Sequence, residues 1–362
     1  AESHVLVDAK RRTTDERWTA RVTTTVQSLP GITPSESGIE ISHYGGRKDR
    51  RVKASGFFRV EKFEDRWWFV DPEGYLWSSV GCCSVRPNPT ARGQAALKKR
   101  YGDTAGWARC TARRLAEHGF NTLACWSSAD HFRNIQPRIP YTTQSNFMSG
   151  YGRLCGGTYQ KPGHTGYPND CIFVFDPEFV DFCRRHAKEA LSATKGDPWL
   201  LGHFSDNEMP FRQDSLDRYL QLDPTDPGRA AAQHWVEEHN IRKDSRGSYS
   251  TEDREAFLEF LSDTYFRIVG RAIRVAVPNH MVFGARFHGS VLRSASVFRG
   301  CGPHVDVVSC NYYGSWTPDP ERLANWVEWS GSPFMVTEWY AKGMDSGMAN
   351  ITGAGWTVRT QK

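Results

Sequence analysis

The sequence predicts an α/β protein whose parallel sheet closes into a (β/α)8 TIM barrel, and three observations lead to this fold class. Apolar runs of strand length alternate with helical patterns roughly seven times after Leu76, as repeated β–α units do. The first run is almost entirely apolar, as a parallel strand covered by helices on both faces requires. The glycine fingerprint of an open dinucleotide-binding sheet is missing, because its nearest match, residues 150–155, lacks the last glycine.

Two parts of the chain differ in pattern. Residues 1–56 are predicted to be a β-rich accessory segment or linker, with turn residues such as Pro30 and Gly31. The charge run at 47–51 is interpreted as a solvated loop. The catalytic barrel is predicted over residues 57–362.

The barrel region opens with a predicted hairpin, in which residues 57–60 and 67–70 flank a turn at 71–74. Apolar runs then predict the parallel strands: residues 76–85, 120–126, 171–175, 199–204, 281–287, 305–312 and 333–337. Periodic patterns and capping residues predict the helices: one from Asp103 to Gly119, one begun by Asp176 and Pro177, and others at 250–277, 291–298 and 321–329.

Two departures from a regular barrel are expected. Residues 127–170 are polar and glycine-rich, and such a long loop inside a domain is usually functional or an insertion. Only seven strands can be counted before Lys362. The barrel is therefore expected to lack its last strand in this chain, which would expose a sheet edge.

The composition excludes several classes of protein. The 362 residues are 39% hydrophobic and 24% charged, and the formal net charge of +5 is too small and dispersed to indicate a nucleic-acid-binding protein. No apolar stretch approaches the length of roughly 18 residues that a membrane span needs. The aromatic share of 13%, with 13 Trp, is high, and aromatic faces bind both sugars and bases.

The nine cysteines are spread along the chain without a CxxC pair. Their odd number and spacing argue against a disulfide scaffold and a zinc site. We expect no metal and no other cofactor. The chain begins at Ala1 without Met or a hydrophobic leader, as a processed export product or a trimmed chain would.

Polar residues at the C-terminal ends of barrel strands carry the chemistry of this fold. Glu208 and Glu338 follow two different predicted strands and are 130 positions apart. Hydrolysis of a glycosidic bond needs such a pair, with one carboxyl protonated and the other ionised. Either glutamate alone would more often form a surface salt bridge. Asp206, beside Glu208, either tunes it or caps the following turn and is not counted as catalytic.

Asn207 before Glu208, a second glutamate three strands later, and a tyrosine pair between them resemble the retaining glycoside hydrolases of clan A. More narrowly, four segments resemble the β-agarases of glycoside hydrolase family 50: residues 57–60, 68–74, 205–208 and 338–347. The resemblance covers the chain from about Ala54 to the C-terminus. It implies a (β/α)8 barrel preceded by a β-rich accessory region.

The resemblance also implies residue roles. Glu208 would be the general acid/base and Glu338 the nucleophile. Asn207 would hold the sugar hydroxyl next to the reacting carbon. Tyr312 or Tyr313 would hydrogen-bond the nucleophile, with Tyr313 slightly preferred.

Further substrate-binding residues are expected near strand ends. His288 follows one predicted strand, where a polar residue would face the cleft, although a structural histidine is about as common there. Trp126, Trp316 and Trp339 lie where they could stack against sugar rings. A tryptophan in such a place is slightly more often a core residue.

The sequence is thus interpreted as a retaining glycoside hydrolase that cleaves a β-linked galactan, of agarose or porphyran type by resemblance. Its partner would be a polysaccharide or oligosaccharide, and such a substrate implies a secreted or periplasmic enzyme. Two alternatives remain open. One is another clan A glycosidase, such as a β-galactosidase or β-mannanase, and the other is a non-catalytic carbohydrate-binding protein.

Overall fold

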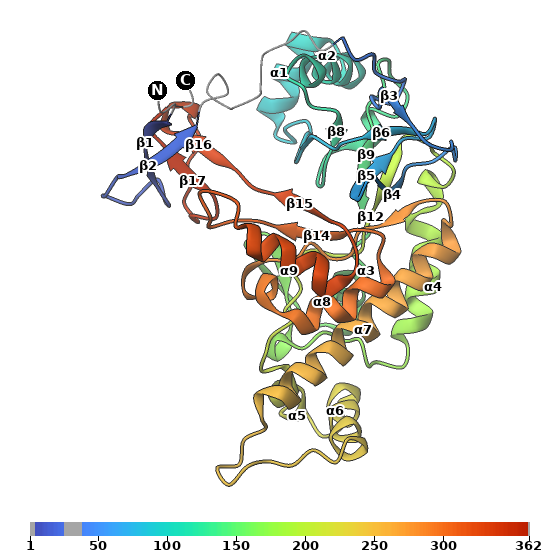
Figure 1. Cartoon of the computed structure of the whole chain (residues 1–362), viewed down its shortest axis with the longest axis vertical. Coiled ribbons are helices and arrows are strands. Elements are labelled where there is room, and N and C mark those ends of the chain that lie inside the picture. Colours follow the sequence, from blue (N-terminus) through green and yellow to red (C-terminus); the bar gives the residue numbers. More distant parts are fainter. Residues whose placement is uncertain (1–3, 25–37, 361–362) are drawn as a thin grey trace.

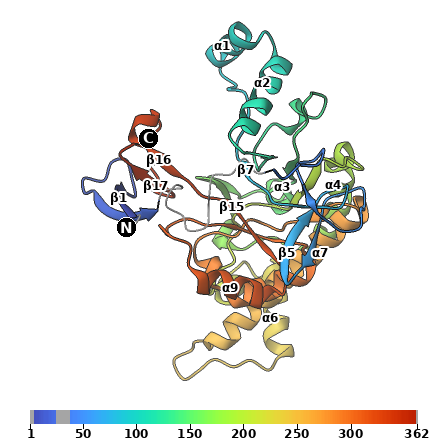
Figure 2. The ribbon, with the colours of Figure 1, turned by 45° about the horizontal axis from the view of Figure 1, so that its top comes forward.

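The computed structural model describes residues 4–24 and 38–360 and has a mixed α/β architecture. A layer of helices that includes α4, α7, α8 and α9 packs along the central strands, and a small sheet near both termini stands apart from them (Figure 1). In the turned view, helices α1 and α2 project at the top, away from α6 at the bottom (Figure 2).

Seven parallel strands form the centre of the described structure. Five of them make one sheet in the order β13-β12-β9-β8-β7. Their bounds are β7 Gly81–Cys82, β8 Thr122–Leu123, β9 Tyr141–Gln144, β12 Leu200–Phe204 and β13 Met281–Val282. Strands β14 (Val308–Asn311) and β15 (Phe334–Glu338) pair with each other in parallel, and a bridge from Phe287 to Cys310 joins them to the chain after β13. Each strand therefore neighbours the next one along the chain, as crossover connections produce.

Two of the predicted parallel strands differ in the structure. The run 76–85 is divided, because its start belongs to the antiparallel strand β6 (Tyr75–Trp77) and only β7 is parallel. The prediction of a strand at 171–175 is wrong, because this stretch is irregular between the 3-10 turn η3 (Pro168–Asp170) and α4. It is apolar because Cys171, Ile172 and Val174 pack into the main core. The third strand is β9, which lies inside the predicted loop 127–170.

The rest of the predicted loop is also structured. It contains helix α3 (Phe147–Cys155) and an antiparallel hairpin of β10 (Tyr159–Lys161) and β11 (His164–Gly166). The polar composition misled the prediction because several of these residues line a polar pocket instead of the core.

The main helices follow their capping residues. Helix α2 (Thr104–Glu117) begins after Asp103, whose carboxylate accepts a hydrogen bond from the backbone N–H of Gly106. Helix α7 (Thr251–Ala276) begins with a capping box at Ser250, and α9 (Pro320–Ser330) lies within one residue of its prediction at either end. The remaining helices are α1 Ala91–Tyr101, α5 Ser215–Leu220 and α6 Pro227–Glu238.

Two helix boundaries differ from the prediction. Helix α4 (Phe179–Ala190) begins after Glu178, because Asp176 closes a turn by accepting a hydrogen bond from the backbone N–H of Glu178. The predicted helix 291–298 is divided into η5 (Gly289–Arg293) and α8 (Ala295–Cys301), and the hydroxyl of Ser294 caps the second piece.

A four-stranded sheet with the order β3-β6-β5-β4 precedes the parallel strands. The predicted hairpin is confirmed as β4 (Arg59–Phe63) and β5 (Arg66–Val70), which pair with β6 (Tyr75–Trp77). The predicted solvated loop at 47–51 is instead the exposed edge strand β3 (Arg47–Arg51). Its charged side chains suit a sheet edge, where they discourage pairing with another chain.

The other small sheet joins the two ends of the chain. Strands β1 (His4–Lys10) and β2 (Thr19–Thr24) pair with β17 (Trp356–Val358), which in turn pairs with β16 (Ala341–Gly343). No eighth parallel strand joins β15 among the described residues, because the chain after it turns into this terminal sheet. The predicted turn at Pro30 and Gly31 lies outside the described residues.

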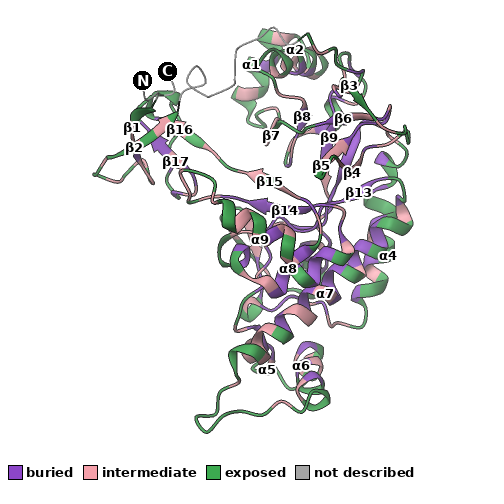
Figure 3. Ribbon diagram, in the orientation of Figure 1, coloured by how far each residue is buried: buried purple, intermediate pink, exposed green. Residues whose placement is uncertain are grey.

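The largest core lies between the parallel strands and the helices α4, α7, α8 and α9, and its buried residues are among the purple ones of Figure 3. Aromatic rings fill much of it, as with Phe287, Phe298 and Trp326. All nine cysteines carry free thiols. Within residues 4–24 and 38–360, no three His, Cys, Asp or Glu side chains gather to hold a metal ion. In the same ranges, no helix is long and apolar enough to cross a bilayer.

Candidate active site

Both predicted glutamates lie at the C-terminal ends of parallel strands. Glu338 is the last residue of β15, and Glu208 follows β12 by four positions. Glu208 adopts a left-handed backbone conformation with φ of 50°, and its N–H donates to the carbonyl of Ala285. A left-handed conformation is uncommon for a residue other than glycine, and such positions gather at functional sites.

Asp206 fixes the loop that carries Glu208. Its carboxylate is fully buried and accepts hydrogen bonds from the backbone N–H groups of Met148 and Ser149 and from the hydroxyl of Tyr265. The two backbone donors belong to the first turn of α3, so Asp206 caps that helix. Burial raises the pKa of the Asp206 carboxyl, and these donors oppose the rise. Of the two alternatives for Asp206, capping is the one observed, though on α3 and not on the following turn.

Three polar side chains surround the carboxyl of Glu208. The side-chain amide of Asn311 donates to its Oε1 at 2.8 Å. The Nδ1 of His164 lies 3.2 Å from Oε2, and the Nδ1 of His288 lies 3.7 Å from Oε1. His164 acts on the carboxyl by hydrogen bonding and charge, whereas the more distant His288 acts through charge.

These contacts set the acidity of Glu208. Burial raises the pKa of the carboxyl, but His164, His288 and Asn311 lower it, and the balance leaves the pKa below its ordinary value. The group is therefore poised to be ionised in the ligand-free protein, and displacement of a histidine would allow its pKa to rise.

Glu338 has different partners. The guanidinium of Arg286 donates to its Oε1 at 2.6 Å, and the hydroxyl of Tyr313 donates to its Oε2 at 2.8 Å. The side chain of Arg286 is fully buried, whereas that of Glu338 is 21% exposed. Burial and the neighbouring Glu338 charge raise the pKa of Tyr313 above its ordinary value. Tyr313 thus remains a hydrogen-bond donor to this carboxylate.

Two chains of hydrogen bonds connect the glutamates. In one, Asn311 donates to Glu208 and accepts from the hydroxyl of Thr337, the residue before Glu338. In the other, Arg286 donates both to Glu338 and, at 3.1 Å, to the Oδ1 of Asn207, the residue before Glu208. The two strand ends therefore belong to one network, although they are far apart in the sequence.

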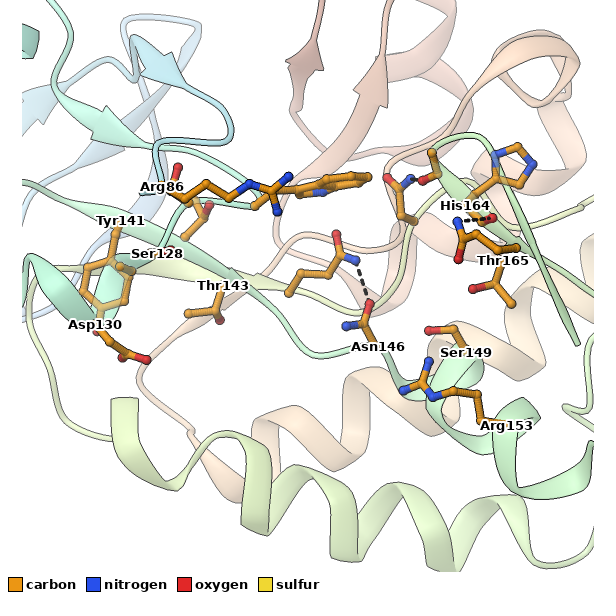
Figure 4. Close-up of a pocket in the computed structure, with 18 residues that line it drawn as sticks. Arg86, Ser128, Asp130, Tyr141, Thr143, Asn146, Ser149, Arg153, His164 and Thr165 are labelled. Carbon is orange, nitrogen blue, oxygen red and sulfur yellow. Dashed lines mark hydrogen bonds between the residues drawn. The ribbon is translucent and has the colours of Figure 1, made fainter. Parts of the chain in front are cut away.

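A polar pocket of about 550 Å³ opens beside this network. Asn207 and His164 line it and also contact the network. Figure 4 shows His164 among the side chains of the wall. Hydroxyl and amide side chains make up most of its wall, among them Ser128, Thr143, Gln144, Asn146, Ser149 and Thr165. Its size is that of a small-molecule site, and its hydrogen-bonding wall suits a ligand with many hydroxyl groups.

Several of the predicted binding residues lie at this site. Asn207 donates to the carbonyl of Gly163 and accepts from Arg286. His288 lies beside Glu208, and Tyr313 contacts Glu338. The ring of Trp126 lines the pocket, with the Arg286 guanidinium 5.3 Å from its centroid.

The other predicted residues have different surroundings. Tyr312 is buried against Trp326, and its hydroxyl accepts a hydrogen bond from the backbone of Asp319, so its side chain faces the core and α9. The indole of Trp316 donates to the carbonyl of Val22 in the terminal sheet. Trp339 follows Glu338 and is 72% exposed.

Sequence reasoning missed three residues of the network. Arg286 and Asn311 lie inside the runs 281–287 and 305–312, which the pattern predicts as strands. A single charge in an otherwise apolar run was the available signal for Arg286, since an arginine is rarely buried without a partner. His164 lies in the predicted loop 127–170, where no periodic pattern marks it.

Comparison with known proteins identifies relatives among the agarases, although no protein-family model matches the chain. β-Agarase B of Vibrio sp. (strain JT0107) is 24% identical over 412 residues, covering 85% of this chain and 41% of that protein. β-Agarase A of the same strain is 25% identical over 327 residues, covering 76% of this chain and 32% of that protein. The chain thus spans less than half the length of these curated relatives.

Solved structures agree with this relationship. BpGH50 matches with a TM-score of 0.86 and 25% identity, over 99% of this chain and 81% of that chain. The agarase AgWH50C matches with a TM-score of 0.67 and 25% identity, over 85% of this chain and 53% of that chain. The resemblance to family 50 β-agarases, which the motifs indicate, is confirmed to the extent that homologues of this chain are β-agarases. The mixed α/β fold with its N-terminal β-rich part also matches these structures.

Proposed function

We propose that this chain is a glycoside hydrolase that cleaves a β-linked galactan, of the agarose or porphyran type, with retention of anomeric configuration. The observation that carries this proposal is the hydrogen-bond network joining Glu208 and Glu338 beside a polar pocket. The homologous β-agarases support the choice of a galactan.

In this mechanism Glu338 is the nucleophile. Arg286 and Tyr313 each donate to one of its oxygens, which orients the carboxylate toward the anomeric carbon. Attack forms a glycosyl–enzyme ester and breaks the bond to the leaving oxygen. The positive charge of the buried Arg286 stabilises the negative charge of the Glu338 carboxylate before the attack and again after the glycosyl–enzyme ester is hydrolysed.

Glu208 is the general acid/base of the proposal. Its carboxyl donates a proton to the leaving oxygen in the first step and removes a proton from the attacking water in the second. Its low pKa in the free protein means that the proton must be gained as substrate binds. A sugar that displaces His164 or His288 from the carboxyl would raise the pKa in the required direction.

The other predicted residues would bind the substrate. Asn207 would exchange its bond to the Gly163 carbonyl for one to the hydroxyl beside the reacting carbon. Trp126 and His288 would border the sugar bound at the cleavage point. A retaining mechanism needs the two carboxyl groups about 5–5.5 Å apart, and an amide that spans Glu208 and Thr337 supports such proximity.

We further propose that the seven parallel strands are those of a (β/α)8 barrel, over residues 57–362, with the β-rich part up to residue 56 as an accessory segment. The thiol of Cys83, just after β7, donates to the carbonyl of Thr337 in β15. This contact supports a sheet that curves until its first and last strands approach each other. A polymeric substrate would also require a secreted or periplasmic enzyme.

The stereochemistry of the first product tests the proposal. Purified protein is incubated with agarose, porphyran, a β-galactoside and β-mannan, and the anomeric proton of the new reducing end is followed by NMR. We expect hydrolysis of a galactan and initial release of the β-anomer. Initial release of the α-anomer would contradict the retaining mechanism, and turnover of the β-galactoside or mannan alone would favour another clan A activity.

Substitution of the glutamates separates an enzyme from a binding protein. Glu208→Gln and Glu338→Gln should each lose nearly all turnover while oligosaccharide binding persists. Glu237→Gln on α6, an exposed glutamate far from the network along the chain, is the matched control and should keep full activity. Hydrolysis unchanged in both site variants would show that the site is assigned wrongly.

A further inference from the structure

The polar pocket contains two arginines that the proposed mechanism does not use. Arg86, after β7, and Arg153, on α3, both line the pocket, and both side chains are drawn and labelled in Figure 4. In that view Arg153 lies toward the end of the pocket where His164 and Thr165 are found. The two guanidinium groups therefore come from different elements to the wall of one cavity.

Neither guanidinium is neutralised by the protein. Within the part of the chain that the structure describes, Arg86 and Arg153 have no side-chain hydrogen bond and no ion pair with a carboxylate. The one carboxylate of the pocket wall, Asp130, pairs with Arg133 at 3.4 Å, and Arg133 is outside the lining. The wall therefore presents two uncompensated positive charges to whatever fills the pocket.

Such an arrangement favours an anion. A guanidinium group presents a planar fork of donors that matches the oxygens of a carboxylate or a sulfate. The wall carries these two arginines against one carboxylate, and a concave surface with an excess of positive charge gathers counter-ions in the cavity. A neutral sugar would satisfy the hydroxyl and amide groups of the wall and would leave both arginine charges without a counter-charge.

We propose that Arg86 and Arg153 form a subsite for an anionic substituent of the sugar chain, either a sulfate ester or a uronate carboxylate. The inference rests on the proposed function and makes it more specific, because the pocket would then select charged galactans over neutral ones. Neither Glu208 nor Glu338 lines this pocket, so the charged sugar would sit beside the residue that is cleaved and not on it.

Binding to a variant that cannot turn over substrate tests the subsite directly. Calorimetric titration of the Glu208→Gln variant uses three galactan oligosaccharides of equal length: one neutral, one with a sulfate ester and one with a uronic acid. We expect at least one charged ligand to bind about tenfold or more tightly than the neutral one, as charge-assisted hydrogen bonds imply. The preference should weaken as salt concentration rises.

Substitution of the arginines assigns the preference. Arg86→Gln with Arg153→Gln should abolish it, each single variant should reduce it, and Arg→Lys should restore part of it, because Lys keeps the charge without the fork. Arg113→Gln on α2 removes an exposed arginine outside the pocket and should leave the preference unchanged. If the double variant does not fold, as judged by circular dichroism, the single and Lys variants decide.

The possible outcomes are distinct. Equal affinity for charged and neutral ligands, or a preference that survives removal of the arginines, would overturn the subsite. If the subsite is overturned but the protein still hydrolyses neutral agarose, the proposed function stands. Conversely, a lost preference in the arginine variants of a chain that hydrolyses no galactan would support the subsite and refute the activity. Comparison of the two charged ligands identifies sulfate or carboxylate as the recognised group.

Discussion

The surroundings of Glu208 and Glu338 differ in how firmly each carboxylate is held. Glu338 meets a fully buried arginine and a tyrosine, two donors that keep their protons over the working range of an enzyme. Glu208 meets an amide and two imidazoles, which lower the pKa of its carboxyl against the effect of burial. One carboxylate is held by an arginine and a tyrosine, whereas the pKa of the other depends on neighbours that a bound sugar could displace. The contrast matches the two proposed roles.

The largest expected effect is a difference in reaction rate between the Glu338→Gln and Glu208→Gln variants that appears only with a good leaving group. On a galactan, Glu338→Gln and Glu208→Gln should both lower kcat by about a thousandfold or more. On an aryl galactoside whose leaving group needs no proton, Glu208→Gln should still form the glycosyl–enzyme at a near-normal rate, because acid assistance is unnecessary. Burst kinetics of aryl release measure this step. Equal loss in both variants would remove the distinction between the two sites.

The second effect concerns Arg286 as a positioning residue. Arg286→Met leaves Glu338 without its buried partner, and kcat should fall about a hundredfold with a much smaller change in KM, because orientation of the carboxylate matters most in the transition state. Arg286→Lys should restore part of the rate. A variant in which KM rises while kcat holds would show that Arg286 contributes only to binding.

The stability of the same pair gives an independent measurement. Breaking a buried ion pair by removing one partner costs about 3–5 kcal/mol, so Glu338→Gln should lower the free energy of unfolding markedly, while Glu208→Gln should lower it less. Urea titration of both variants tests this order. If Glu208→Gln is the more destabilised of the two, Arg286 does not depend on Glu338 for its charge balance.

The smallest effect is a displacement of the pH profile. His164 lowers the pKa of Glu208, so His164→Ala should raise that pKa. A general acid works only while protonated, and the alkaline limb of the profile of kcat/KM against pH should therefore move to higher pH. His234→Ala on α6, an exposed histidine far from the site along the chain, should leave the limb in place. A shift to lower pH in His164→Ala would contradict the proposed protonation state.

The sequence predicted the repeating parallel strands and both carboxylates because strands buried on both faces have a strong apolar signal. It failed where side chains face the pocket. Strand β9 reads Tyr-Thr-Thr-Gln, and its polar residues hid it in a predicted loop. The apolar residues 171–175 had the opposite effect, because core packing without pairing resembles a strand in sequence. Because β9 was missed and residues 171–175 were wrongly predicted as a strand, the predicted number of parallel strands still equals the observed number.

The candidate site was predicted only in part, because the pattern shows where a strand ends and not which distant residues it meets. Glu208, Asn207 and Tyr313 follow recognisable strand ends, so position along the chain sufficed to select them. Arg286 and Asn311 act through contacts with residues 52 and 103 positions away, and periodicity carries no information about such pairs. Trp316 was selected by its place near a strand end, and that place did not reveal that its indole contacts the terminal sheet.

The terminal sheet has a consequence for the order of folding during synthesis. Strand β1 pairs with β17, and the carboxylate of Asp8 accepts a hydrogen bond from Arg359, 351 positions later. At a translation rate of about 5–20 residues per second, the first hairpin waits roughly 20–70 s on the ribosome for its neighbour. During that interval one edge of β1 lacks its partner, so this hairpin stays open to pairing with other chains until β17 is made.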